Sequence, residues 1–401
     1  MKKVFITGAK RTAIGTLGGT LKKTSAVKLG VTAAKAAMAQ SGIKGDNIDE
    51  TIVGNILSAG QGMGPGRQVS IHAGVPEEKP GYTVNMVCGS GMKSVMTGAS
   101  DILLGEADTV LAGGIENMTM APYLLPKGRF GYRLGDGKIV DHLVSDGLTD
   151  VFNAYHMGVT AENIAERYEI SRAQQDQFAA ESQKRAGRAM EENKFQEEIT
   201  PVEIKTRKGT VTFDKDEHPR PQTTVESLGK LRPAFKKDGS VTAGNSSGIN
   251  DGASMTVIMS EEKMNELGAK PLAELVAFSQ HGVEPAVMGL GPVGAIRKVL
   301  KKANMKLTDI ELLELNEAFA VQSLGVMMAL EKEHGVSREW LMERTNVNGG
   351  AIALGHPVGC TGNRIIVTLL YEMKKRGLKY GLASLCIGGG MGTAVILKNC
   401  E

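Results

Sequence analysis

Two stretches of the chain carry the same succession of hydrophobic and polar positions. Residues 31–40 and residues 293–302 each repeat apolar side chains at the period that predicts an amphipathic helix. A polar turn with an aspartate follows each helix. A short apolar run of β-strand character comes next and ends in asparagine, Asn55 in the first copy and Asn316 in the second. The pattern therefore predicts a helix–turn–strand unit that occurs twice.

The likeness between the two copies continues along the chain. A small, glycine-rich turn at residues 88–91 opens a predicted helix, and an apolar run at residues 109–112 then ends in two glycines. Residues 356–362 open a second predicted helix, and the run at residues 382–385 leads to three glycines. Any α/β protein alternates strands, glycines and helices, but several elements matching in order favour an internal duplication. The runs are apolar throughout, which is typical of strands buried on both faces.

The middle of the chain, from about residue 121 to residue 241, differs from both copies. It is polar and contains two predicted helices, at residues 160–168 and 172–193, and a basic, turn-rich stretch at residues 205–221. Segments inserted into a rigid core often bind substrate. We therefore expect an α/β protein with two related halves and an inserted region over the core.

Composition narrows the class of protein. A chain of 401 residues is too long for one ordinary core, and its 41% hydrophobic and 23% charged residues are typical of a globular protein. The net charge is +3 and acids and bases are mixed, so no basic face suggests a nucleic-acid partner. No stretch approaches the length of a membrane span, and we expect no membrane partner.

Cysteine, histidine and glycine usage narrows the class further. Four cysteines at irregular spacing do not form a disulfide framework, so we expect a reducing compartment, the cytoplasm. No Cys or His pair has the spacing of a structural zinc site, and we expect no metal. The glycine-rich segment at residues 60–66 lacks the Gly-Lys-Ser/Thr of a phosphate-binding loop, and no dinucleotide fingerprint follows the first strand.

Cys88 is the most informative single residue. It ends an apolar run and is followed by Gly-Ser-Gly and a predicted helix, so its sulfur is expected at a helix N-terminus. Backbone N–H dipoles there favour the thiolate, which is the nucleophilic form. The alternative is a buried structural cysteine, which is the commoner role of an isolated cysteine in a sheet.

Two further residues could act with such a thiolate. His356 stands between Gly355 and Pro357, where it could accept the thiol proton or could be a turn histidine bonded to backbone. Cys386 ends an apolar strand before three glycines. It could transfer protons while nearby backbone N–H groups hold an oxyanion, or it could be a core cysteine at a strand end.

Polar and small residues elsewhere complete the candidate chemistry. Asn316 follows an apolar strand, so its amide could orient a water in an oxyanion site. It could equally cap the helix that follows. Residues 242–252 are small and polar, and they form either a plain turn or a loop that contacts a long, thin ligand.

These motifs together resemble the thiolase family, and most closely its biosynthetic acetyl-CoA acetyltransferase branch. The similarity runs nearly end to end and rests on four motifs in one order: Asn85…Cys88-Gly89-Ser90-Gly91, Asn316-Glu317-Ala318-Phe319, Gly355-His356-Pro357 and Cys386…Gly388-Gly389-Gly390. It implies a thiolase-like, five-layered α/β fold of two duplicated halves with an inserted loop domain. The expected domains are an N-terminal half (1–120 plus 249–270), a loop domain that binds coenzyme A (121–248) and a C-terminal half (271–401).

The resemblance also implies an acyltransferase that condenses two acetyl-CoA to acetoacetyl-CoA and coenzyme A in a reversible, ping-pong reaction. Cys88 would take the acetyl group while His356 takes the thiol proton. Cys386 would remove a proton from the methyl group of the second acetyl-CoA. Asn316, through a water, and His356 would form one oxyanion site, and the backbone N–H groups of Cys88 and Gly388 the other. The coenzyme A thioesters are substrates, so no separate cofactor is implied.

The same resemblance assigns residues to the coenzyme A site. Ala243 and Ser247 would contact the pantetheine, and Arg220 would bind a phosphate unless it is a solvated surface charge. The acyl pocket would be lined by His156, Met157, Phe235, Met288, Ala318 and Phe319. Two positions depart from the family pattern: Thr361 replaces a usual serine but keeps its hydroxyl, and Gly66 replaces a usual alanine. A homotetramer, built as a dimer of dimers, is expected by resemblance.

Other functions stay open at this point. A thiolase-fold protein that only binds acyl-CoA would not need intact Cys88, His356 and Cys386. A β-ketoacyl synthase or a hydroxymethylglutaryl-CoA synthase would lack the second cysteine in its glycine-rich context. A longer-chain degradative thiolase is the nearest alternative, against which the run 156–158 favours the short-chain branch. Because both cysteines should approach the same substrate atoms, we also expect mild oxidation to join Cys88 and Cys386 reversibly in a disulfide.

Overall fold

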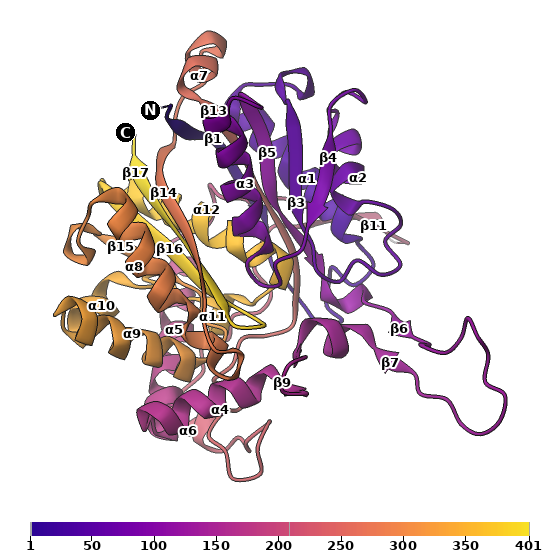
Figure 1. Cartoon of the computed structure of the whole chain (residues 1–401), viewed down its shortest axis with the longest axis vertical. Coiled ribbons are helices and arrows are strands. Elements are labelled where there is room, and N and C mark those ends of the chain that lie inside the picture. Colours follow the sequence, from indigo (N-terminus) through magenta and orange to yellow (C-terminus); the bar gives the residue numbers. More distant parts are fainter. Residues whose placement is uncertain (1, 208, 401) are drawn as a thin grey trace.

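The computed structural model describes residues 2–207 and 209–400, and strands form the centre of its first half (Figure 1). In space they run β1 (Val4–Thr12), β13 (Asn250–Ser260), β5 (Thr109–Asn117), β3 (Glu50–Gly54) and β4 (Gly81–Val84). β13 is antiparallel to both β1 and β5, whereas β3 is parallel to β5 and β4. The strand that returns after the middle of the chain is therefore central to this half.

The second half repeats that arrangement. Its strands run β14 (Ala273–Gly282), β17 (Met391–Asn399), β16 (Tyr380–Ile387) and β15 (Leu312–Leu315). The pairings are antiparallel, antiparallel and parallel, as they are from β1 to β3. The last strand of each half thus lies beside its first strand, which confirms the predicted duplication. The two halves join where a short stretch of β1 pairs with β14.

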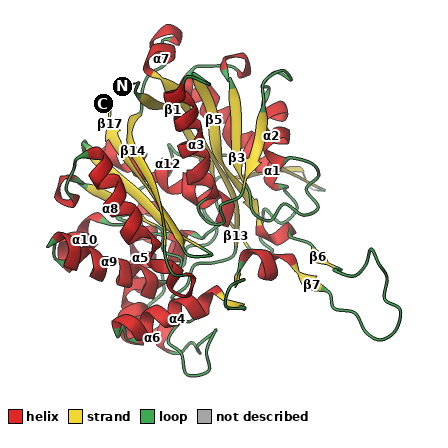
Figure 2. Ribbon diagram, in the orientation of Figure 1, coloured by secondary structure: helices red, strands yellow, loops and turns green. Residues whose placement is uncertain are grey.

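Helices separate and cover the two halves, which gives five layers (Figures 1 and 2). α1 (Ala26–Ser41) and α2 (Pro65–Ala73) pack on the first half, and α8 (Gly291–Ala303) packs on the second. α3 (Ser90–Leu104) and α12 (Val358–Arg376) contact each other in the middle layer, and α12 touches strands of both halves. Every residue of α12 from Val358 to Met373 is buried.

The two central helices cross with almost no space between their backbones. A Cβ added at Gly91 would lie 2.8 Å from the backbone nitrogen of Asn363 and 2.9 Å from the carbonyl oxygen of Gly359. A Cβ at Gly362 would collide with the backbone of Met92. Glycine is needed at both positions because any side chain would push the helices apart. The crossing fixes the starts of α3 and α12, which follow Cys88 and His356.

The predicted succession of elements is present in both halves. The helical stretches at residues 31–40 and 293–302 lie within α1 and α8, which end at the left-handed residues Gly42 and Asn304. A 3₁₀ turn follows each helix, η1 (Gly45–Asn47) and η5 (Leu307–Asp309), and then come β3 and β15. The helix–turn–strand units read from the sequence are therefore confirmed.

The middle of the chain forms an arm and a layer of helices. The loop between β6 (Tyr123–Leu124) and β7 (Val140–Asp141) projects away from the rest of the molecule in Figure 1. α4 (Met157–Tyr168) and α5 (Arg172–Glu191) pack against α9 (Ala320–His334), and α6 (Val225–Gly229) packs against α5. The two helices predicted in this region are thus α4 and α5.

Short elements complete the fold, and most of them lie in connecting segments. They are β2 (Gly15–Thr16), η2 (Met118–Met120), η3 (Leu143–Gly147), β8 (Thr149–Asp150), β9 (Tyr155–His156), β10 (Ile199–Thr200), β11 (Val202–Thr206), β12 (Gly209–Phe213), α7 (Glu261–Leu267), η4 (Pro285–Leu290), α10 (Arg338–Arg344) and α11 (Ala351–Leu354). Within residues 2–207 and 209–400, no helix combines the length and the apolar character needed to cross a membrane.

Candidate active site

Cys88 lies in a tight turn between β4 and α3. Val87, just before it, adopts a left-handed backbone conformation with φ of 45°, which is rare for a β-branched residue. Ser90 holds this turn, because its Oγ accepts from the Met86 N–H (2.9 Å) and donates to the Val87 carbonyl (2.6 Å). Strained backbone of this kind collects at functional sites. The turn presents the Cys88 sulfur at the start of α3, as the sequence predicts.

The second glycine-rich turn meets the Cys88 sulfur. The backbone N–H groups of Gly388 and of Cys88 itself act to lower the pKa of this thiol. A Cβ at Gly388 would lie 2.9 Å from Met157 Cε and 3.2 Å from Val87 Cγ1, so these side chains would have to shift to admit one. The two N–H groups expected to form an oxyanion site therefore both act on the Cys88 sulfur.

The protonation of Cys88 differs from the expectation for a helix N-terminus. Burial of the sulfur raises the pKa of Cys88 to about 11, although the two N–H bonds act in the opposite direction. Withdrawal from water disfavours the charged thiolate more strongly than the local dipoles favour it. The resting group is consequently a neutral thiol, which needs a base to become a nucleophile.

Cys386 lies beside Cys88 at the end of β16. It is 1% exposed, and burial followed by the charge of Cys88 raises the pKa of its thiol. The sequence left open whether Cys386 is a core cysteine or acts in the site. In the structure Cys386 is buried in the core and also lies beside Cys88, so the two alternatives are compatible. Both thiols are free, so a disulfide between them stays a prediction.

His356 is held in one orientation by both its backbone and its ring. Its backbone N–H donates to Asn250 Oδ1 at 2.9 Å, and its Nδ1 lies 2.7 Å from Thr361 Oγ1. The Thr361 hydroxyl donates its own proton to the Pro357 carbonyl at 3.0 Å. While that hydroxyl donates to Pro357, its oxygen can accept from a protonated Nδ1, and this tautomer leaves a lone pair on Nε2.

The free nitrogen of His356 is suited to accept a proton. Nε2 is buried and has no hydrogen-bond partner among the residues that the structure describes. Burial, helped by the positive charge of Arg364, lowers the pKa of His356 to about 3, so the resting imidazole is neutral. The alternative of a turn histidine bonded only to backbone does not fit an unpartnered Nε2.

Asn316 directs an unsatisfied amide into the interior. Its backbone N–H donates to the Ser384 carbonyl at 3.0 Å, whereas neither its Oδ1 nor its Nδ2 has a partner in the described part of the chain. The helix-cap alternative is wrong, because α9 begins at Ala320 and Phe319 is its N-cap residue. A buried amide without partners costs about 1–3 kcal/mol, so its position suits a bound water or a substrate oxygen.

Aromatic and apolar side chains gather in the buried cluster that contains Cys386. His156 stacks on Phe235 with ring centroids 4.6 Å apart, and Phe235 meets Phe319 edge to face at 6.1 Å. Met288 and Ala318 belong to the same buried cluster as Phe319, and Met157 and Phe235 pack against it. The residues predicted to line the acyl pocket are therefore neighbours in one apolar cluster.

The residues predicted to contact coenzyme A differ in how closely they join this cluster. The Ser247 N–H donates to the Ala318 carbonyl at 2.9 Å, which ties its loop to the segment after Asn316. Ala243 lies exposed in the same loop. Arg220 is exposed, and its backbone N–H donates to Gln183 Oε1 at 2.7 Å. None of these contacts tests whether the Arg220 side chain binds a phosphate, so that role stays a prediction.

Glu116 is a residue of the site that sequence reasoning missed. Its buried carboxylate accepts N–H bonds from Asn55 Nδ2 (2.8 Å), Ile56 N (3.1 Å), Leu57 N (3.2 Å) and Gly359 N (3.0 Å). It thereby ties a loop of the first half to the first turn of α12, just after His356. The only signal in the sequence was an acid within an otherwise apolar strand.

Within the described ranges, no group of three or more His, Cys, Asp or Glu side chains is arranged to hold a metal ion.

Comparison with known families accounts for this geometry. The model of the thiolase N-terminal domain matches residues 4–262, and that of the thiolase C-terminal domain matches residues 269–399. The chain belongs to the thiolase family. This agrees with the resemblance inferred from the four sequence motifs, and each half of the duplicated fold falls largely under one of the two models.

Individual thiolases are similar over the whole chain. An acetyl-CoA acetyltransferase of Syntrophomonas wolfei is 53% identical over 401 residues and covers 99% of both chains. A solved acetyl-CoA acetyltransferase from Syntrophomonas wolfei has a TM-score of 0.97 at 45% identity and covers 100% of both chains. Human mitochondrial 3-ketoacyl-CoA thiolase has a TM-score of 0.94 at 44% identity, with 100% of this thiolase and 99% of that chain covered. The predicted thiolase-like fold is confirmed.

Proposed function

We propose that this thiolase is an acetyl-CoA C-acetyltransferase, which condenses two acetyl-CoA to acetoacetyl-CoA and coenzyme A and also runs in reverse. The observation that carries the proposal is the meeting of two free thiols, Cys88 and Cys386. His356, a neutral imidazole with an unpartnered Nε2, precedes α12, the helix that crosses α3 after Cys88. The relatives named acetyl-CoA acetyltransferase, at 53% and 51% identity, support the same substrate.

The first half-reaction is acyl transfer to Cys88. His356 Nε2 takes the thiol proton as the sulfur attacks the thioester carbon. A new carbon–sulfur bond to Cys88 forms, the bond to coenzyme A breaks, and the proton passes to the departing sulfur. The N–H groups of Cys88 and Gly388 would stabilise the oxyanion that develops in this step. The low pKa of His356 suits the return of the proton, because a buried imidazolium is a strong acid.

The second half-reaction forms the carbon–carbon bond. Cys386 first loses its thiol proton to His356, and its thiolate then removes a proton from the methyl group of a second acetyl-CoA. The resulting carbanion attacks the acetyl group on Cys88. The Cys88 sulfur leaves as a thiolate and recovers the proton from His356, while Cys386 keeps the methyl proton, so all three groups return to their resting states. The high pKa of Cys386 makes its thiolate a strong base. The unpartnered amide of Asn316, through a water, and the Nε2–H of the protonated His356 would stabilise the enolate oxygen.

The alternatives differ in what they require of this site. Simple binding of acyl-CoA would not require a base beside a nucleophile, and the other condensing enzymes would lack Cys386. A longer-chain degradative thiolase remains the second candidate, because the human 3-ketoacyl-CoA thiolase is nearly as similar in structure. The stack of His156, Phe235 and Phe319 across the apolar cluster favours a short acyl group. Comparing thiolysis of acetoacetyl-CoA with that of 3-ketooctanoyl-CoA separates the two.

We further propose a division into an N-terminal half (1–120 and 249–270), a coenzyme A-binding loop domain (121–248) and a C-terminal half (271–401). The return of β13 to the centre of the first half supports this division.

A cytoplasmic location suits a site with two free thiols, which would oxidise outside a reducing compartment. A homotetramer is supported by the apolar side chains on the projecting arm.

The decisive test is mass spectrometry of the intact protein after mixing with acetyl-CoA. The wild type is expected to gain one acetyl group, and Cys88→Ala is expected to gain none because the nucleophile is gone. Cys360→Ala serves as the control, since that cysteine is buried in α12 and takes no part in the proposed reaction. If the wild type shows no adduct with acetyl-CoA, and none with acetoacetyl-CoA plus coenzyme A, the proposed function is wrong.

A further inference from the structure

Two irregular segments of the middle region border the proposed coenzyme A site. We call residues 228–235 the first wall and residues 240–247 the second wall. The first wall begins at the end of α6 and includes Phe235, and the second includes Ala243 and Ser247. Beyond that end of α6, neither wall contains a helix or a strand. Their placement therefore depends on contacts outside regular secondary structure.

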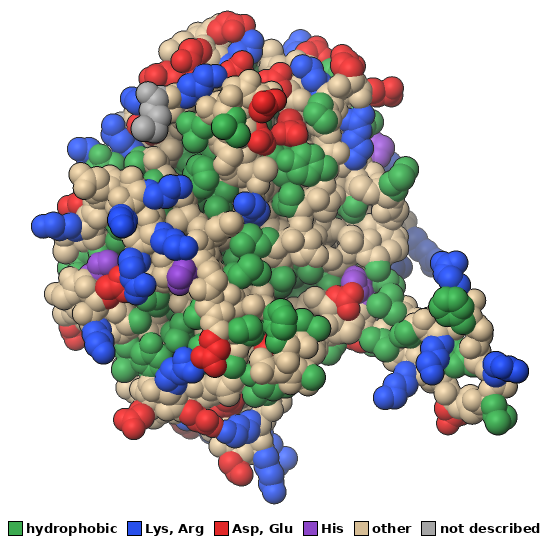
Figure 3. Space-filling view, viewed as in Figure 1, with side chains coloured by type: hydrophobic (Ala, Val, Ile, Leu, Met, Phe, Trp, Pro, Cys, Tyr) green, Lys and Arg blue, Asp and Glu red, His purple; other side chains and the backbone are tan. Residues whose placement is uncertain are grey.

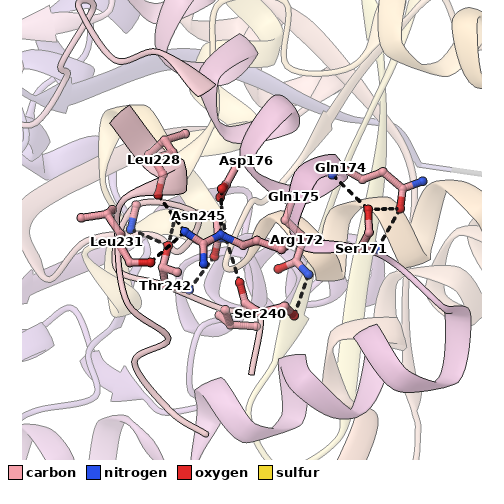
Figure 4. A network of polar contacts seen from close by, with 12 residues as sticks. Ser171, Arg172, Gln174, Gln175, Asp176, Leu228, Leu231, Ser240, Thr242 and Asn245 are labelled. Atoms are coloured by element: carbon pink, nitrogen blue, oxygen red, sulfur yellow. Dashed lines mark hydrogen bonds and ion pairs between the residues drawn. The ribbon is translucent and has the colours of Figure 1, made fainter. Parts of the chain in front are cut away.

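Arg172, the first residue of α5, holds the first wall. Its Nη2 donates to the carbonyl oxygens of Leu228 (2.7 Å) and Leu231 (2.9 Å). Its Nε donates to Asp176 Oδ2 at 2.7 Å, one turn along the same helix (Figure 4). One guanidinium thus binds the end of α6, the wall that follows it, and a carboxylate on α5. Only the planar fork of arginine can direct donors to three acceptors in this way.

Asp176 is also hydrogen-bonded to the second wall. Its Oδ1 accepts from Asn245 Nδ2 at 2.9 Å, so its two oxygens serve the two walls separately. Asn245 also donates to the Ser240 carbonyl (3.2 Å) and accepts from the Thr242 N–H (2.8 Å), which closes the second wall into a loop. Asp176 and Asn245 are 2% and 0% exposed, so water does not compete for these bonds.

The second wall in turn contacts the segment that carries Asn316. The Asn245 carbonyl accepts from the Ala320 N–H at 2.8 Å, and the Ser247 N–H donates to the Ala318 carbonyl at 2.9 Å. One other hydrogen bond joins the walls directly, from Ala234 N to the Val241 carbonyl at 2.9 Å. Arg172, Asp176 and Asn245 therefore form a second connection between the walls at the opposite end of the first wall.

We propose that Arg172, Asp176 and Asn245 are a positioning unit, the wall bracket, which holds the two walls against each other and so places the residues that border the pantetheine arm of coenzyme A. This inference rests on the proposed function. The bracket touches neither Cys88 nor His356, so it governs how tightly the thioester binds rather than how fast the acyl group moves. α5 does not depend on it for attachment, because Phe178 and Ala179 already bury α5 in the core.

The test compares two acyl donors in the acetylation of Cys88. Acetyl-CoA would extend along both walls, whereas S-acetyl-N-acetylcysteamine lacks the nucleotide and most of the pantetheine. For Asp176→Asn, which places an amide N–H against either Arg172 or Asn245, we expect acetylation by limiting acetyl-CoA to slow about tenfold. Acetylation by the truncated donor should stay within about twofold of the wild type, and the loss with acetyl-CoA should appear in KM rather than in kcat.

Two other variants keep the test sharp. Arg172→Lys retains the charge but not the three directed bonds, so it should show the same donor-specific loss even if Asp176→Asn folds poorly. Lys263→Ala removes an ion pair with the exposed Glu266 on α7, outside both walls, and should match the wild type with both donors. Equal losses with both donors, or no loss with acetyl-CoA, would overturn the bracket. Acetylation of the wild type tests the proposed function independently.

Discussion

At the scale of single residues, the site depends on which nitrogen of His356 carries the proton. The Thr361 hydroxyl favours a proton on Nδ1, because a hydroxyl that donates to the Pro357 carbonyl can only accept from the ring. The lone pair is left on Nε2 in a buried position where protonation is unfavourable. A threonine in place of the usual serine preserves this function, since only the hydroxyl is used.

Thr361→Val should therefore impair the base without changing its position. The Nδ1–H would lose its acceptor, and an unpaired buried donor costs about 1–3 kcal/mol, which favours the tautomer with the proton on Nε2. We expect kcat/KM for thiolysis of acetoacetyl-CoA to fall about tenfold or more. Thr361→Ser keeps the hydroxyl and should retain activity near that of the wild type. Equal activity of the valine and serine variants would contradict the argument.

At the scale of elements, the order of helices and strands could be predicted from the sequence. The repeated patterns, the polar middle and the four motifs gave the two halves, α4, α5 and the positions of the two cysteines. What the sequence did not reveal were contacts between distant segments. Glu116 gathers donors from residues 55–57 and 359, and Asn316 keeps its amide free because α9 begins four residues later. Neither of these features produces a hydrophobic periodicity that can be read from the sequence.

Glu116 joins two elements, so its loss should affect both stability and catalysis. In Glu116→Gln an amide N–H would face N–H donors that now point at a carboxylate oxygen. We expect the free energy of unfolding in urea to fall by about 1–3 kcal/mol and the rate of Cys88 acetylation to fall because the first turn of α12 loosens. Glu106→Gln, at an exposed position after α3, is the control. Unchanged acetylation in a destabilised Glu116→Gln would show that the carboxylate serves the fold alone.

At the scale of the whole molecule, the arm between β6 and β7 has no partner within its own chain. Its tip presents exposed apolar side chains next to lysines and arginines (Figure 3): Leu125, Phe130, Leu134 and Ile139 beside Lys127, Arg129, Arg133 and Lys138. An isolated chain gains nothing by exposing such residues to water. The arm is thus the best candidate for a contact between copies of this thiolase.

Replacing residues 125–139 with a short Gly-Ser linker should therefore reduce the size of the assembly. We expect light scattering after size-exclusion chromatography to show a tetramer for the wild type and a smaller species for the variant, because the buried apolar contacts are lost. The paired ends of the arm, Tyr123 with Asp141 and Leu124 with Val140, remain to close the loop. Phe130→Asp with Leu134→Asp should act in the same direction. An unchanged mass in both variants would place the contact elsewhere.

The crossing of α3 and α12 has a consequence for how this thiolase could change its substrate. Backbone touches backbone at Gly91 and Gly362, so the distance between thiol and imidazole is set by main-chain atoms that no side-chain replacement can adjust. The reacting groups and the groups that select the substrate are therefore built on separate parts of the chain. Single substitutions in the irregular walls can therefore change the acyl group or thiol that is accepted. The positions of the reacting groups stay the same.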